Sequence, residues 1–217
     1  MRIPPGLSEH VIALRLLEAL HPGSTSSTDG FASLAHSQSG VSLRCAAVLI
    51  PLLWQAGKWH LLFTRRTDRV ESHKGQVSFP GGECDNEEAT AEDTALREAH
   101  EEIGLHPSDV RIIGRLNDIV TITHYRVTPV VGVIPYSYHF QLSEHEVSRV
   151  FTIPLDWLAQ RENWDEHDLD LDGLPQAWPV IIYHPYDGEV LWGASARMTH
   201  TFLRVLGLIT EEEHFVL

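Results

Sequence analysis

Residues 81–105 read GGECDNEEATAEDTALREAHEEIGL, and this stretch decides how the rest of the chain is interpreted. Its second half predicts a helix in which Glu98, Glu101 and Glu102 occupy positions i, i+3 and i+4 and therefore share one face. Like charges at this spacing repel, and the negative end of the helix dipole near Gly104 adds to the repulsion. A hard divalent cation such as Mg²⁺ or Mn²⁺ binds carboxylate oxygens and would remove it. The spacing therefore predicts a cation site on this helix.

A solvated acidic helix face is the ordinary alternative, because glutamate-rich helix surfaces are common. For the three glutamates alone, that alternative is favoured. The flanking glycines and a second motif upstream shift the balance toward a metal site. Arg97 immediately precedes Glu98 and can brace a carboxylate through a charge-assisted hydrogen bond. Gly82 stands ahead of the helix, and a second motif lies directly upstream of it.

The order of Gly82, a helix and the run Arg97-Glu-x-x-Glu-Glu-x-Gly104 resembles the Nudix box. That family hydrolyses compounds in which a nucleoside diphosphate is linked to another group. The resemblance implies a Mg²⁺ or Mn²⁺ site made by Glu98, Glu101, Glu102 and the Gly82 carbonyl. One departure is that Glu88 stands nine residues before Arg97, one more than usual. The loop entering the helix must hold an extra residue, and the role of Glu88 is open.

The segment just upstream, residues 61–82, reads LLFTRRTDRVESHKGQVSFPGG. It resembles the signature of coenzyme A pyrophosphatases, a Nudix subfamily, and the matching positions include Thr64, Arg66, Gly75 and the final Phe-Pro-Gly-Gly. It departs at Thr67, where Ser or Ala is usual, and at Glu71, where Arg is usual. Arg69 or Lys74 could supply the positive charge that position 71 lacks.

The Nudix resemblance implies the hydrolysis and the upstream signature implies the substrate: coenzyme A, or its acyl or oxidised forms, would be cleaved to 3′,5′-ADP and 4′-phosphopantetheine. Such a reaction requires neutralised charge on the phosphate oxygens and a water in line with phosphorus. The expected catalytic residues are Glu98, Glu101, Arg97 and Glu146. The general base is open between Glu98, Glu144 and Glu146. The residues expected to contact the substrate are Arg66, His73 and Gln76.

Two alternatives to this function are kept. The substrate could be NADH, a dinucleoside polyphosphate or another dinucleotide, cleaved by the same machinery. The chain could also be a nucleotide-binding Nudix module without turnover, since a fold can persist after its activity is lost. The complete set from Arg97 to Glu102 argues against the second alternative.

Composition limits the class of partner. The chain has 217 residues, of which 43% are hydrophobic, so it can bury a core; its formal net charge is −14. That charge argues against nucleic acid as a partner and leaves a small nucleotide screened by metal ions or by a few local cations. No apolar run approaches the ~20 residues of a membrane helix. We expect a cytoplasmic protein with no membrane partner, and the family resemblance allows a homodimer.

The two cysteines are not expected to pair. Cys45 stands in the apolar run Cys45-Ala-Ala-Val-Leu-Ile50 and is interpreted as a small core residue. Cys84 falls in a polar loop and has no evident role. This usage is typical of a reducing compartment.

Strands and helices are mixed without regular βαβ alternation, which predicts an α/β fold with helices packed on a mixed sheet. The Nudix resemblance implies the corresponding α/β/α sandwich. We expect residues 1–40 to form an N-terminal helical arm and linker, residues 41–207 the Nudix domain, and residues 208–217 a tail.

Three helices stand out in the pattern. One begins at the N-cap Ser8 and runs to Leu20, and its expected packing face is Val11, Leu14, Leu17 and Leu20. The others are expected over 87–104, with Gly104 as the C-terminal stop, and over 194–206. Strands are expected at residues 43–53, 59–64, 76–79, 110–116, 126–134 and 180–183, with a hairpin turn at Ala56-Gly57.

Overall fold

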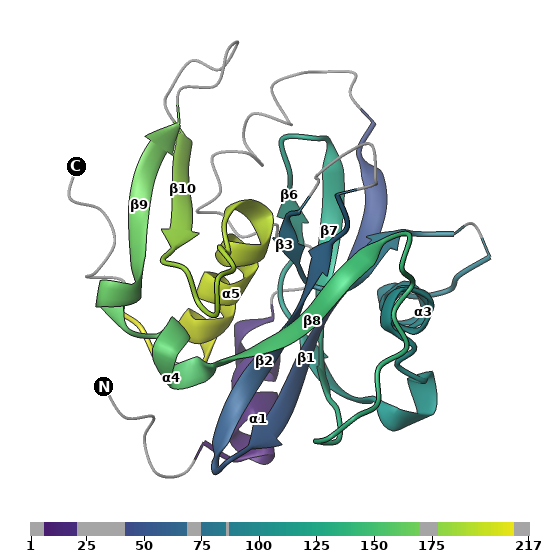
Figure 1. The fold of residues 1–217 in the computed structure, drawn as a ribbon, viewed down its shortest axis with the longest axis horizontal. Coiled ribbons are helices and arrows are strands. Elements are labelled where there is room, and N and C mark those ends of the chain that lie inside the picture. Colours follow the sequence, from purple (N-terminus) through teal and green to yellow (C-terminus); the bar gives the residue numbers. More distant parts are fainter. Residues whose placement is uncertain (1–6, 21–41, 69–74, 86, 170–177, 211–217) are drawn as a thin grey trace.

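The computed structural model in Figure 1 describes residues 7–20, 42–68, 75–85, 87–169 and 178–210. The helices are α1 (Glu9–Ala19), α3 (Ala91–Ile103), α4 (Leu155–Leu158) and α5 (Gly193–Val205). The first strands are β1 (Arg44–Gln55), β2 (Lys58–Arg66), β3 (Val77–Ser78), β4 (Gly81–Glu83) and β5 (Arg111–Arg115). The others are β6 (Ile119–Val120), β7 (Tyr125–Val133), β8 (Val147–Pro154), β9 (Trp164–Leu169) and β10 (Trp178–Tyr183).

Strand β1 organises the main sheet. It pairs in parallel with β7 along one edge, from Arg44 opposite Tyr125 to Leu52 opposite Val133. On its other edge it pairs antiparallel with β4 and then with β2. Strand β2 continues the sheet to β8 and β3, and β7 continues it to β5 and β6. The sheet is therefore mixed, as predicted.

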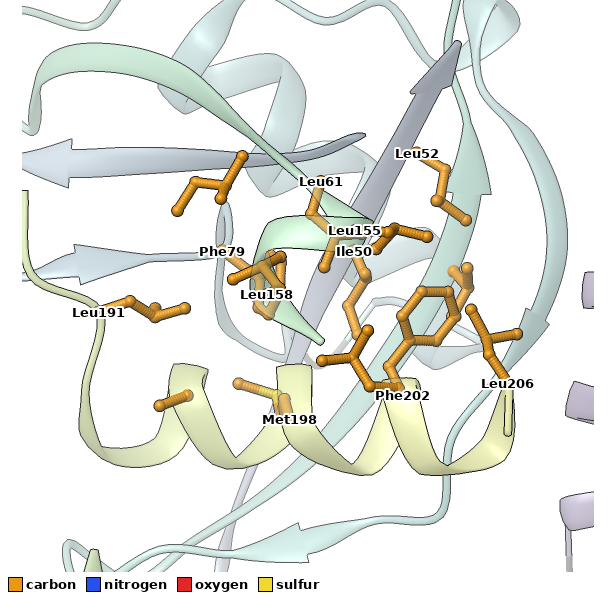
Figure 2. Packing of buried hydrophobic residues seen from close by; sticks show 14 of the residues in the cluster. Ile50, Leu52, Leu61, Phe79, Leu155, Leu158, Leu191, Met198, Phe202 and Leu206 are labelled. Atoms are coloured by element: carbon orange, nitrogen blue, oxygen red, sulfur yellow. The ribbon is translucent and has the colours of Figure 1, made fainter. Parts of the chain in front are cut away.

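Helices cover both faces of this sheet (Figure 1). On one face, Ala95, Ala99 and Ile103 of α3 are fully buried in a cluster with Leu49 of β1. On the other face, α1, α4 and α5 share a larger cluster. Figure 2 shows Met198, Phe202 and Leu206, from α5 and its C-terminal end, gathered beside Ile50, Leu52 and Leu61 of the sheet. Each buried side chain of this size contributes about 1.5–3 kcal/mol, so the sandwich is held from both sides.

Helix α1 belongs to the same core, but its packing face differs from the predicted one. Ser8 caps the helix as expected, accepting a hydrogen bond from the Val11 backbone. The buried residues are Ile12 and Leu16, whereas Leu14 and Leu17 are 43% and 70% exposed. The predicted Val11–Leu14–Leu17–Leu20 face was wrong for Leu14 and Leu17, whereas Val11 is partly buried and packs against the cluster. Leucines lie on more than one side of this helix, and only the docking partner selects among them.

Local chemistry sets the ends of α3. Gly104 adopts the left-handed conformation at φ +67° and ends the helix, as predicted. The start lies four residues later than predicted, at Ala91. Thr90 and Asp93 form a reciprocal capping box, in which each side chain accepts from the other residue's backbone N–H. That cap fixes the first turn and leaves Glu87 and Glu88 in the preceding loop.

The two cysteines form a disulfide, contrary to prediction. Cys45 lies at the start of β1, where its side chain is exposed rather than in the core, and Cys84 follows β4 directly. Antiparallel pairing of β1 with β4 brings the two Cα atoms to 5.4 Å across 39 residues of sequence. The reading of Cys45 as a core residue and of Cys84 as incidental was wrong. The inference of a reducing compartment therefore loses its basis.

A second, two-stranded sheet of β9 and β10 was only half predicted. Strand β10 was expected, but its partner β9, which reads WDEHDL, was not. Its described polar side chains are exposed, so it lacks the apolar alternation that marks a half-buried strand. Among the described helices, none is both long and apolar enough to cross a membrane.

Candidate active site

Glu102 is a buried carboxylate at the C-terminal end of α3. Its side chain is 6% exposed, and the Gly81 backbone of β4 hydrogen-bonds to it. Its second oxygen, Oε2, has no hydrogen-bond partner among the described residues. Burial, reinforced by repulsion from Glu98 and Glu146 and opposed by Arg66, raises the pKa of Glu102 to about 8. A polar atom left without a partner in such a place marks a site that a ligand can complete.

Glu98 lies one turn earlier and against the main chain of Gly82. A Cβ atom at position 82 would stand 2.5 Å from the Glu98 carboxyl carbon, so only glycine leaves room for this approach. Burial raises the pKa of Glu98, although a hydrogen bond from Arg97 works in the opposite direction. Strand β4 therefore places one backbone residue against each of two carboxylates, Gly81 at Glu102 and Gly82 at Glu98.

Arg97 connects the loop before α3 to the acidic face. Its Nε donates to Glu88 at 2.7 Å, and its Nη1 donates to Glu98 at 2.7 Å and to Glu101 at 2.9 Å. Its Nη2 donates to the Glu83 carbonyl at 2.9 Å. The hydrogen bond to Glu88, with those to the helix, raises the pKa of Arg97 above its ordinary value. The guanidinium is thus held in one orientation by four acceptors.

Glu88 has a definite structural role despite the extra residue in the loop. Its Oε1 accepts from Arg97, and its Oε2 accepts from the Thr94 hydroxyl at 2.6 Å and from the Asp85 backbone at 2.8 Å. Although burial acts in the opposite direction, the bonds from Arg97 and Thr94 lower the pKa of Glu88. Glu88 closes the loop onto the first turns of α3.

The loop between β7 and β8 brings Glu146 to the same place. The Ser143 backbone donates to the Glu102 carbonyl at 2.9 Å, which ties this loop to the end of α3. Glu146 lies close enough to raise the pKa of both Glu98 and Glu102 by charge repulsion. Glu101 is exposed and bound to Arg97, and Glu144 is an exposed residue of the loop.

The upstream signature segment meets the acidic helix through Arg66. Its Nη1 is 3.9 Å from Glu102 Oε1, and its Nε has no hydrogen-bond partner among the described residues. The Thr67 backbone donates to the Glu146 carbonyl at 2.9 Å, and the Arg66 backbone donates to the Gln76 carbonyl at 3.0 Å. The Gln76 side-chain amide lies beside Gly193 at the start of α5. His73 lies outside the residues that the structure describes.

Comparison with known protein families assigns the chain to a family. The NUDIX domain family matches residues 43–171, more than half of the chain. The chain belongs to the Nudix family.

Relatives that match most of the chain agree with this assignment. An Escherichia coli K12 protein named uncharacterized Nudix hydrolase NudL is 48% identical over 165 residues, which cover 76% of this chain and 84% of the relative. A NudL protein of Enterobacter sp. strain 638 is 37% identical over 172 residues, covering 79% and 88% respectively. A MutT/nudix family protein from Enterococcus faecalis shares the fold with a TM-score of 0.50 at 15% identity, over 84% of this chain and 75% of that one. The protein is a Nudix pyrophosphatase, an enzyme acting on small nucleotide compounds.

The site fits the divalent cation that Nudix hydrolases generally require. A buried carboxylate oxygen without a partner, a glycine that admits a second carboxylate to the main chain, and a third carboxylate nearby form a hard, oxygen-only donor set. Within the described residues, no group of three or more His, Cys, Asp or Glu side chains has the spacing of a completed metal site. In the described conformation, Glu98 and Glu101 are bound to Arg97.

Sequence reasoning found the carboxylates and named the Gly82 carbonyl, but it missed the contacts of Gly81 and of the Glu83 carbonyl with the helix. Gly81, Gly82 and the Glu83 carbonyl each contact a different residue of the Nudix helix. The only signal for this was the glycine pair itself, since two glycines before a helix indicate a close approach of main chain to something else.

Proposed function

We propose that this Nudix enzyme hydrolyses the diphosphate bond of coenzyme A, or of an acyl or oxidised form of it, to 3′,5′-ADP and 4′-phosphopantetheine. The water's hydroxyl bonds to one phosphorus as the P–O bond from that phosphorus to the bridging oxygen breaks, and the bridging oxygen leaves with the second phosphate. The remaining proton of the water passes to the general base and from there to the leaving phosphate or to solvent.

One observation carries the choice of substrate. The segment that resembles the coenzyme A pyrophosphatase signature packs directly onto the acidic helix, with Arg66 beside Glu102 and Thr67 bonded to the backbone of Glu146. A segment that distinguishes one Nudix subfamily from others is expected to contact the substrate, and here it adjoins the carboxylates. Arg66, His73 and Gln76 are our candidates for contacts to the phosphates or the pantetheine arm.

The carboxylates of the Nudix helix are assigned to metal binding. Glu98, Glu101, Glu102 and the Gly82 carbonyl would hold Mg²⁺ or Mn²⁺, which neutralises charge on the diphosphate oxygens when bound. Arg97 orients Glu98 and Glu101 by its paired hydrogen bonds. Glu102 remains buried and so keeps a fixed position relative to the substrate.

The proton of the attacking water needs an acceptor near the carboxylates. Glu146 is an exposed residue on a loop tied to the end of α3, free of any assigned metal role. Glu98 is the alternative, but it is already bonded to Arg97. We therefore favour Glu146 as general base, with Glu98 second.

Product analysis tests the proposal. Wild-type enzyme, Glu102→Gln and the exposed loop variant Glu87→Gln are incubated with coenzyme A in Mg²⁺ or Mn²⁺. We expect 3′,5′-ADP and 4′-phosphopantetheine from wild type and from Glu87→Gln, and roughly 10²-fold slower release from Glu102→Gln. Cleavage of NADH or a dinucleoside polyphosphate but not of coenzyme A would reject the substrate and keep the reaction. Binding of nucleotides without cleavage would reject both.

A further inference from the structure

Strand β4 is a three-residue support for the acidic helix. The Gly81 backbone hydrogen-bonds to Glu102, Gly82 lies against Glu98, and the Glu83 carbonyl accepts from Arg97. Each residue of the strand thus contacts a different member of the site. Any displacement of β4 relative to α3 would alter all three contacts at once.

The next residue after this strand is covalently fixed. Cys84 is bonded to Cys45 of β1, and its backbone N–H also donates to the Cys45 carbonyl at 3.0 Å. The Cys45 side chain is exposed and Cys84 is half-buried, so small reagents in solution can reach the bond. The chain has no other cysteine. Thiol chemistry on this protein is therefore confined to one place, at the end of the strand that supports the carboxylates.

We propose that the Cys45–Cys84 disulfide is a redox-sensitive positioning element of the active site, so that its reduction weakens divalent-cation binding and slows hydrolysis. The inference rests on the proposed function in so far as it assigns the metal to Glu98 and Glu102. A dithiol supplies two electrons and two protons, becomes a disulfide itself, and leaves Cys45 and Cys84 as free thiols. The loop from Cys84 to Glu88 then loses its covalent attachment to β1.

Noncovalent contacts limit the size of the change. Glu83 accepts hydrogen bonds from Tyr125 at 2.5 Å and from Arg44, whose guanidinium lies 4.7 Å from the Tyr125 ring centre. The β1–β4 ladder is made by backbone pairing that does not involve the sulfur atoms, with Ala46 opposite Glu83. The reduced protein is therefore expected to stay folded with β4 less firmly placed. Outer contacts of metal ligands typically change affinity by about 10- to 100-fold when removed, and a loosened contact belongs at the lower end.

The experiment compares one protein in two redox states. Wild type is purified without reductant, a portion is reduced with dithiothreitol, and the reagent is removed by anaerobic desalting. Alkylation and mass measurement count the free thiols. Free Mn²⁺ is then measured by electron paramagnetic resonance during titration, and the unfolding midpoint and hydrolysis rate are recorded on the same samples. We expect roughly tenfold weaker Mn²⁺ binding after reduction, restored on reoxidation. The double variant Cys45→Ser/Cys84→Ser should match the reduced protein and ignore dithiothreitol.

Three results would overturn the proposal. One is equal Mn²⁺ affinity, within twofold, in samples with no free thiols and with two. Another is persistence of two free thiols after treatment with oxidised glutathione. The third is loss of the folded state on reduction, because the bond would then stabilise the domain as a whole. If the redox state changes Mn²⁺ affinity while coenzyme A is cleaved in neither state, the positioning role stands and the proposed substrate fails.

Discussion

Glu102 sits where the surrounding packing favours the neutral acid. Its pKa is about 8 in the folded protein against an ordinary value of 4.5. Between these two values the folded state binds more protons than the unfolded state, so this residue makes the metal-free protein less stable as pH rises from 4.5 to 8. A cation that binds the charged form removes that penalty, and its apparent affinity falls as pH drops below about 8.

We predict that Glu102→Gln stabilises the metal-free protein while removing its activity. Gln keeps the shape of the side chain and cannot ionise, so the gain over wild type should grow from near zero at pH 4.5 to roughly 2 kcal/mol or more at pH 8. Urea unfolding in the presence of a chelator, at both pH values, measures the difference. Identical stability differences at the two pH values would show that Glu102 is not held neutral by burial.

A second residue-scale prediction concerns Gly82. In Gly82→Ala the new methyl group would stand 2.5 Å from the Glu98 carboxyl carbon, so Glu98 must move. We expect a loss of activity of roughly 10²-fold, because a proposed metal ligand would be misplaced by about 1 Å. Gly57→Ala is the matched control. Its added Cβ would meet nothing within 4 Å, although the alanine must adopt φ +79°. That control should lower the free energy of unfolding by about 1 kcal/mol and leave kcat/KM unchanged. Full activity in Gly82→Ala, together with reduced activity in Gly57→Ala, would contradict the role of Gly82.

At the scale of elements, local signals in the sequence were sufficient wherever local chemistry decides the structure. The Ala56-Gly57 turn has both residues at positive φ and joins β1 to β2 as predicted, and Gly104 ends α3 for the same reason. What failed depends on contacts between distant residues. The pairing of Cys45 with Cys84 follows from the β1–β4 register, which no local pattern encodes.

In the candidate site, too, local spacing predicted some features, whereas others depend on contacts between distant residues. The spacing of Glu98, Glu101 and Glu102 places them on one helix face, but it says nothing of which carboxylate is buried. Glu102 is buried because the loop after β7 closes over the end of α3, and Glu101 is exposed beside Arg97. The extra residue before Arg97 left the role of Glu88 open in the sequence. Its three hydrogen-bonded partners show that the longer loop still closes onto the helix.

Helix α1 supplies the prediction at this scale. Leu16 is 1% exposed and packs against Gly114 of β5, where an added Cβ would lie 3.0 Å from the Leu16 Cβ atom. Leu16→Ala should cost about 2–5 kcal/mol of unfolding free energy, because it leaves a cavity between helix and sheet. Leu17→Ala, on a residue that is 70% exposed, should change stability by less than about 0.5 kcal/mol. Chemical denaturation of both variants measures this, and equal effects would mean that α1 docks through another face.

At the scale of the whole molecule, the charge of the chain and the charge of the site reinforce each other. A formal net charge of −14 creates a field that attracts cations and repels a phosphorylated substrate. Arg66 and Arg97 are the local exceptions next to the carboxylates. A substrate carrying phosphates can approach this surface only where such side chains, and a bound divalent ion, reverse the local sign.

Divalent ions should therefore raise the unfolding temperature of the whole protein, and this rise should depend on Glu102. A cation bound only by the folded state adds about 2.7 kcal/mol at a hundredfold excess over its Kd, which for a chain of this size raises Tm by about 5–10 °C. We predict such a rise in Tm for wild type with Mn²⁺ at pH 8, and scanning calorimetry measures it. Sodium chloride at equal ionic strength separates site binding from general screening of the negative surface. Glu87→Gln should keep the full rise and Glu102→Gln should lose most of it, because only Glu102 is buried against the backbone of β4. An equal rise in both variants would place the stabilising ion elsewhere on the acidic surface.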